Sequence, residues 1–217
     1  MQDQPTITAG QDSAEERAGG MARADFLKVA ALATGAVATG RILLAGSPSV
    51  ASAARRSPHQ DRDILNFLLL LEYLQAAFYK DAVNSGALHG DLAQFAQVVA
   101  GHEKAHVTAL RRKLGSHARR APAFDFGNAT SDPHRFAAAA TKLEELAVGA
   151  FVGQGANLTR GAVLRVARIA SVEGRHAAWV RDIQTHLPAP SAADAAIGQH
   201  EVASTLRALG FIKGGAS

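Results

Sequence analysis

A single carboxylate stands inside a stretch of the chain that is otherwise apolar on every side. Residues 64–74 read Ile-Leu-Asn-Phe-Leu-Leu-Leu-Leu-Glu-Tyr-Leu, and Glu72 is the only charged residue among them. A helix that is apolar all round is buried, and an unpaired buried charge costs several kcal/mol. Other helices must therefore supply groups that compensate Glu72.

The pattern of apolar residues and helix breakers predicts an all-α bundle. Asp61 is expected to cap the first helix, Gly115 to end the second, and Asp132-Pro133 to begin the third. Short links within each pair of helices predict two antiparallel hairpins, and the link over residues 115–131 is long enough to cross the length of a bundle. No segment has a strand pattern. The four helices are expected over residues 61–84, 91–114, 132–158 and 159–186.

The two halves of the chain repeat one arrangement of ligand-type residues. Each half offers a Glu in an apolar helix and then Glu-x-x-His on the next helix, and three residues of separation put Glu and His on one helix face. The spacing from the first Glu to the Glu-x-x-His is 31 residues in the first half and 29 in the second. This spacing equals the length of chain needed to finish one helix, make a turn and return along the next helix, so that the Glu and the Glu-x-x-His lie at the same level of the bundle. The residues predicted to converge are Glu72, Glu103, His106, Glu144, Glu173 and His176.

Two further comparisons between the halves refine this prediction. Leu71-Glu72-Tyr73-Leu74 parallels Leu143-Glu144-Glu145-Leu146, so the repeat selects Glu144 for the site and predicts that Glu145 faces solvent. An aromatic residue follows seven positions later in both halves, as Tyr79 and as Phe151. Tyr79 is expected near the site. An aromatic residue in such a position is more often part of the hydrophobic core than a redox relay.

Glu plus Glu-x-x-His, given twice on four helices, resembles the ligand set of ferritin-like di-iron and di-manganese carboxylate proteins. Residues 61–187 more closely resemble exported bacterial ferritin-like domain proteins related to desiccation-associated proteins. The resemblance implies that the six residues bind two divalent metal ions, iron or manganese, with O₂- or peroxide-linked redox chemistry or a role in stress protection. Oxidase, ferroxidase and catalase activity all remain open. The matching stretches are Asp63–Phe67, Leu71–Tyr73, Ala100–His106, Phe124–Phe126 and Val172–Trp179.

Two alternatives compete with this interpretation. The first is a bundle without metal or catalysis, which protects against desiccation or binds a partner. The second is a zinc-dependent peptidase, because His102-Glu103-Lys104-Ala105-His106 reads H-E-x-x-H. The repeat argues against the peptidase, since Val172 stands at the position equivalent to His102. Buried Glu72 and Glu144 would also remain without a role in a peptidase.

The first 53 residues are predicted to hold a disordered terminus and an export signal. A basic segment at residues 23–28 precedes an apolar stretch, and Ala51-Ser52-Ala53 is an A-x-A cleavage site. The segment resembles a twin-arginine leader, but Ala24 replaces the second arginine and Arg41 interrupts the apolar stretch, so the export route is open. The periplasm or cell envelope is the expected location, or the cytoplasm if the leader does not function.

The remaining expectations concern domains and partners. The bundle is expected over residues 54–187, and residues 188–217 are expected to form a tail that docks on the bundle or on a partner. The chain has no Cys, which excludes thiolate metal sites. Its net charge of +4 comes from Arg scattered between carboxylates, which does not indicate specific nucleic-acid binding. A homo-oligomer is possible, and no stable membrane span is expected after leader cleavage.

Overall fold

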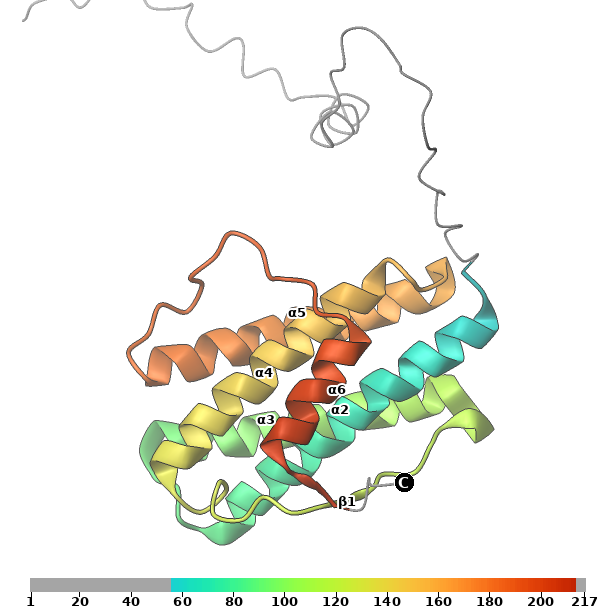
Figure 1. Cartoon of the computed structure of the whole chain (residues 1–217). Coiled ribbons are helices and arrows are strands. Elements are labelled where there is room, and N and C mark those ends of the chain that lie inside the picture. Colours follow the sequence, from blue (N-terminus) through green and yellow to red (C-terminus); the bar gives the residue numbers. More distant parts are fainter. Residues whose placement is uncertain (1–55, 214–217) are drawn as a thin grey trace, which may run out of the picture. The chain divides into compact units, whose positions relative to one another are not determined.

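The structure, a computed structural model, describes residues 56–213. The leader expected over residues 1–53 lies outside this range. The predicted all-α four-helix bundle is confirmed: α2 packs against α3, and α4 packs against α5, as two hairpins (Figure 1). No helix within residues 56–213 is long and apolar enough to cross a membrane. The four helices are α2 (Pro58–Ser85), α3 (Gly90–Leu114), α4 (Pro133–Gly155) and α5 (Arg160–Ile183).

The connection between α3 and α4 runs back along the length of the bundle, as its length predicted (Figure 1). It contains the short 3₁₀ helix η1 (Gly115–His117) and the strand β1 (Ala123–Phe124). β1 pairs antiparallel with β2 (Ile212–Lys213) near the end of the described chain. The expectation of no strand is therefore wrong. A two-residue strand is too short to show alternation in sequence, and its partner is remote along the chain.

The start of α2 differs from the prediction. Ser57 is the N-cap, with its hydroxyl accepting a hydrogen bond from the Gln60 N–H, and Pro58 occupies the first turn. Asp61 is instead a buried acceptor that receives the Thr159 N–H at 2.9 Å and the Thr159 hydroxyl at 2.5 Å. This carboxylate ties the beginning of α2 to the beginning of α5 and so helps to fix the height of the two helices.

The start of α4 agrees with the prediction, whereas two helix ends do not. Asp132 caps α4 by accepting the Arg135 N–H at 2.9 Å, and Pro133 follows it. α4 ends at Gly155 and α5 ends at Ile183, each three residues before the predicted end. The apolar pattern continues past the end of α4 because Leu158, just beyond that helix, remains buried in the core.

The segment after α5 contacts the bundle and contains a further helix, α6 (Gln199–Leu209), which the sequence analysis did not predict. α6 packs against α4 (Figure 1), with Val202 and Leu206 buried. Before α6 the chain passes over α4, where the Ile197 N–H donates to the Gly149 carbonyl at 2.9 Å. A Cβ built at Gly149 would lie only 2.4 Å from the Ile197 side chain, so glycine permits this close approach.

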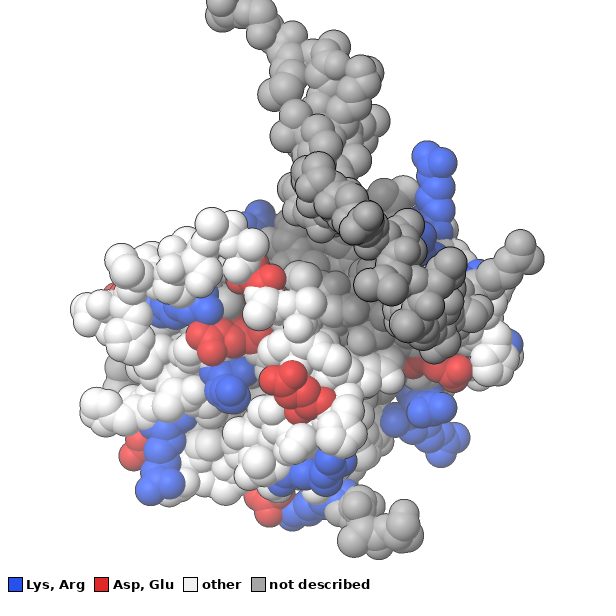
Figure 2. All heavy atoms as spheres, turned by 45° about the horizontal axis from the view of Figure 1, so that its top comes forward, with Lys and Arg blue, Asp and Glu red and all other residues white. Residues whose placement is uncertain are grey.

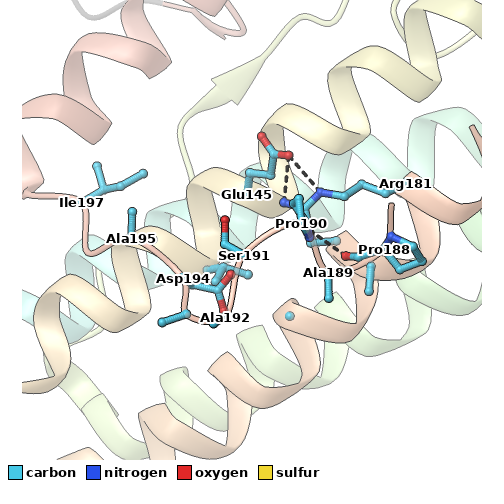
Figure 3. Close-up of a pocket in the computed structure, with 16 residues that line it drawn as sticks. Glu145, Arg181, Pro188, Ala189, Pro190, Ser191, Ala192, Asp194, Ala195 and Ile197 are labelled. Carbon is cyan, nitrogen blue, oxygen red and sulfur yellow. Dashed lines mark hydrogen bonds and ion pairs between the residues drawn. The ribbon is translucent and has the colours of Figure 1, made fainter. Parts of the chain in front are cut away.

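An ion pair with Arg181 of α5 explains the position of Glu145. The Glu145 carboxylate accepts from Arg181 at 2.9 Å, and Arg181 donates in addition to the Pro188 carbonyl (Figure 3). Glu145 points away from the bundle centre, but it does not simply face solvent as predicted. It is an ion-pair partner that links α4 to α5, and the repeat carried no information about Arg181.

Candidate metal centre

Six side chains from all four bundle helices converge in the interior. None is more than 8% exposed, and the four carboxylates are completely buried. They form two groups of possible ligands, and within each group the nearest ligand atoms lie within 4.8 Å of one another. Glu103 and Glu173 belong to both groups and therefore lie between two candidate metal positions. The first group is Glu72, Glu103, His106 and Glu173, and the second is Glu103, Glu144, Glu173 and His176.

Each imidazole points its Nδ1 atom at three carboxylates. Nδ1 of His106 lies 2.9 Å from Glu173 Oε1 and 3.3 Å from Glu72 Oε2. Nδ1 of His176 lies 3.2 Å from Glu103 Oε1 and 3.3 Å from Glu144 Oε2. Each His also contacts the Glu three residues before it on its own helix, at 3.5 and 3.7 Å, because residues three apart share a helix face.

Most of the polar atoms at the centre of this cluster lack a hydrogen-bond donor or acceptor of suitable geometry. Both carboxylate oxygens of Glu72, Glu103 and Glu173 are without a partner, and so is Nδ1 of each His. Buried polar atoms are normally satisfied, and each exception requires an explanation. Two divalent cations would balance four carboxylates and accept two imidazole nitrogens. The cluster could therefore hold metal, and its donor set fits iron or manganese.

The pKa values of the carboxylates differ strongly between neighbours. Burial raises the pKa of Glu72 well above its usual value, and the nearby Glu103 and Glu173 carboxylates add to this effect. Burial likewise raises the pKa of Glu144 to about 8, although His176 opposes the shift. Burial also tends to raise the pKa of Glu103. The His106 and His176 imidazoles outweigh this effect and lower the pKa of Glu103 to about 2.

The two imidazoles are held in the protonated form when the carboxylates are their only partners. Burial alone would lower the pKa of His106, but Glu103, Glu173 and Glu72 raise it to about 12. The same competition raises the pKa of His176 to about 11. A metal ligand must be a neutral imidazole, so metal binding here would release these protons.

Glu144 has additional partners that the sequence analysis did not assign. Its Oε1 atom accepts a hydrogen bond from Gln75 Nε2 at 3.2 Å and another from the Tyr79 hydroxyl. Tyr79 is completely buried, and burial together with Glu144 raises the pKa of its phenol. The signal for Gln75 was present, because it is an amide three residues after Glu72 in the same apolar helix.

His102 lies outside both groups and contacts the outer side of His176. The distance from His102 Nδ1 to His176 Nε2 is 2.9 Å, and the two rings are stacked with centroids 5.1 Å apart. Among the described residues, His102 and His106 do not join one candidate metal group, as the zinc-peptidase alternative requires. Glu103 is also completely buried between the helices. The geometry therefore favours Glu-x-x-His over H-E-x-x-H.

Comparison with known proteins agrees with this geometry. The sequence model of the ferritin-like domain family matches residues 60–186, which is more than half of the chain. A search of curated proteins finds no match to the chain. The matched range contains the four bundle helices, apart from the first two residues of α2, and all six converging side chains. By this match and its four-helix architecture, the chain belongs to the ferritin-like domain family.

Proposed function

We propose that this protein binds two divalent metal ions, iron or manganese, through Glu72, Glu103, His106, Glu144, Glu173 and His176. The observation that carries the proposal is the set of buried carboxylate oxygens and imidazole nitrogens without partners at the centre of the bundle. Burying four carboxylates costs several kcal/mol, and the protonated His106 and His176 offset this only in part, because the pKa values of Glu72 and Glu144 remain raised. Two bound cations remove that penalty, and Glu103 and Glu173 lie where they can contact both.

The bound ions would supply O₂- or peroxide-linked redox chemistry to an exported protein with a role in stress protection. The residues of the chain prepare this chemistry by excluding bulk water from the carboxylates, all of which are completely buried. Glu144 is oriented by Gln75 and Tyr79, and the Tyr79 phenol holds a proton against its carboxylate. His176 is oriented by His102. Such outer partners fix the direction of a ligand and tune its basicity.

Metal analysis of the full chain, purified from cells grown with both iron and manganese, tests the proposal. We expect about two ions per chain, and we expect Glu103→Ala to remove most of both, because Glu103 belongs to both groups. The matched control is Glu145→Ala, which deletes a carboxylate on the outer side of α4. A parent protein without metal would leave the non-catalytic bundle as the surviving function, and one zinc ion per chain would favour the peptidase.

Export is a separate proposal, supported by the basic segment, the apolar stretch and the A-x-A site of the first 53 residues. Cleavage after Ala53 gives a mature protein that begins at Ala54. Intact-mass measurement of the protein from its native cell tests this expectation. Soluble cytoplasmic protein that still carries Met1 would refute export.

A further inference from the structure

A strip of surface between α3 and α5 leads directly to the six-residue cluster. Two neighbouring pockets there share Ala105, His106 and Val172 in their linings. One of the pockets also reaches His176. His106 and His176 both carry an unpartnered Nδ1 that faces the carboxylates. The outer edges of these two imidazoles therefore form the floor of the strip.

Small residues on α3 create the space for this strip. Gly101, Ala105 and Ala109 are four residues apart, so they form one row along the helix surface. Ala105 and Ala109 line the pockets against α5, and Gly101 continues the row in an adjacent pocket. The carboxylates behind this opening have no exposed surface, and His106 and His176 are almost completely buried, so only a ligand of a few atoms could pass them to reach the cluster.

The charged groups along this gap all have one sign. Arg165 and Arg168 line one pocket and Arg175 lines the other, and the linings of both pockets contain no Asp or Glu. Within residues 56–213, none of these three arginines forms an ion pair. The contrast with other surfaces is clear. The pocket of Figure 3 contains Glu145 and Asp194 beside Arg181, and the face in Figure 2 carries basic and acidic side chains interspersed.

We propose that this gap, which we call the basic gap (lined by Arg165, Arg168 and Arg175), admits small anions to the metal cluster and repels divalent cations. The inference rests on the proposed function and names the class of ligand that reaches the site. With two divalent ions bound, the four carboxylates are neutralised, so the arginines determine the potential at the opening. A cleft of one charge sign raises the local concentration of the opposite charge. The gap therefore favours anionic over cationic ligands of the bound metal ions, and it does not hinder neutral O₂ or hydrogen peroxide.

Trp179 provides a direct probe, because it is the only tryptophan of the chain and it lines the gap beside His176. Fluorescence quenching of the manganese-loaded full chain by iodide, caesium and acrylamide measures access for an anion, a cation and a neutral molecule. We expect iodide, normalised to acrylamide, to quench Trp179 roughly two- to threefold more strongly than caesium at low ionic strength. The preference should disappear at high salt, since such fields are screened within about 10 Å at 0.1 M.

The decisive variant replaces Arg165, Arg168 and Arg175 together with Gln. We expect it to remove most of the preference for iodide. The matched control replaces Lys80, Arg135 and Arg207 with Gln, which removes the same charge from exposed positions on α2, α4 and α6. The control should keep the preference. Equal quenching by iodide and caesium in the parent, or an equal loss of preference in both triple variants, would overturn the inference.

Metal content separates this inference from the proposed function. The Gln variants should retain about two ions per chain, because none of the three arginines belongs to the cluster. In the iron-loaded protein, azide should bind roughly tenfold more slowly to the basic-gap variant than to the control variant. A parent that binds metal but shows no anion preference refutes only the inference. A parent without metal refutes the proposed function, whatever the result at Trp179.

Discussion

The two hairpins of the bundle supply the same ligands but surround them differently. The α2–α3 hairpin gives Glu72, Glu103 and His106, and the α4–α5 hairpin gives the equivalent Glu144, Glu173 and His176. Glu144 accepts two hydrogen bonds, whereas both oxygens of Glu72 have no partner. His176 contacts His102 through its outer nitrogen, whereas no such contact is found for His106 within residues 56–213.

Two sequence differences account for this asymmetry. Tyr79, from the first half, donates to Glu144 of the second half. Its repeat equivalent is Phe151, which has no hydroxyl to offer the first half. His102 contacts His176 across the bundle, and its repeat equivalent is Val172, which cannot hydrogen-bond. The candidate ligands thus follow the repeat, whereas the residues that hydrogen-bond to them do not. The two metal positions should therefore differ in their affinity for metal.

The largest expected difference between the two metal positions comes from removing a carboxylate that belongs to only one of them. Glu72→Ala should empty the position beside His106, and Glu144→Ala should empty the position beside His176, each lowering metal content from two ions to about one per chain. In each variant the affected group keeps only three ligand-type residues, whereas the other group keeps all four. Metal analysis with the Glu145→Ala control measures this. Loss of both ions in either variant would show that the positions are not independent.

The metal-free protein should lose stability as the pH rises from about 5 to 8. The pKa of Glu144 is about 8 in the folded state, above the ordinary value of 4.5, so the folded protein keeps a proton that the unfolded chain has lost. The unfolding free energy therefore falls with rising pH, by up to about 1.4 kcal/mol for each unit of pKa difference. The raised pKa values of His106 and His176 act in the same direction, since their stabilisation is complete below 6.5 and decreases toward 11 to 12.

Thermal unfolding measures this pH dependence. We expect the Tm of the metal-free protein to fall by roughly 5–10 °C between pH 5 and pH 8. The metal-loaded protein should show little change, because the metal ions have displaced the protons. Glu144→Gln should reduce the slope, since an amide does not titrate in this range. A metal-free Tm that rises over the same interval would contradict the assigned direction of the pKa shifts.

Tyr79→Phe should make the metal position beside His176 resemble the position beside His106, whose carboxylate Glu72 accepts no hydrogen bond. The change removes the phenol that donates to Glu144 and leaves a buried acceptor with only Gln75, at a cost of about 1–3 kcal/mol. We expect weaker metal binding beside His176 and unchanged binding beside His106, measured by competition with a chelator. The control is Tyr73→Phe, which removes an exposed hydroxyl that donates to the Arg119 carbonyl. Equal weakening in both variants would show that the phenol does not support Glu144.

The bundle and its converging side chains could be predicted because they follow rules that are local in sequence. Glu-x-x-His fixes two side chains on one helix face, and the matched spacing in both halves sets their heights. The outer partners could not be predicted in this way. His102 is exposed and looked like part of a competing motif, and only the approach of α3 to α5 places it against His176. α6 and the β1–β2 pair likewise depend on contacts of the C-terminal segment with α4 and with the connection between α3 and α4, which are remote from it in sequence.

The smallest expected effect distinguishes support by His102 from ligation by His102. His102→Ala leaves all six candidate ligands in place but removes the contact to Nε2 of His176, so the imidazole loses the group that fixes its orientation. Removal of such a partner typically weakens metal binding by about 10- to 100-fold. We expect this loss beside His176 only, with both ions still bound at saturating metal.

His102→Asn and His176→Ala complete the test of His102. Asn retains a side-chain group that can hydrogen-bond to His176, so it should restore part of the affinity that His102→Ala loses. His176→Ala should empty its position at every metal concentration, because Nδ1 of His176 is itself a candidate ligand. If His102→Ala instead abolished binding as completely as His176→Ala, His102 would be a ligand, and the two halves would differ in their metal-binding residues as well as in their supports.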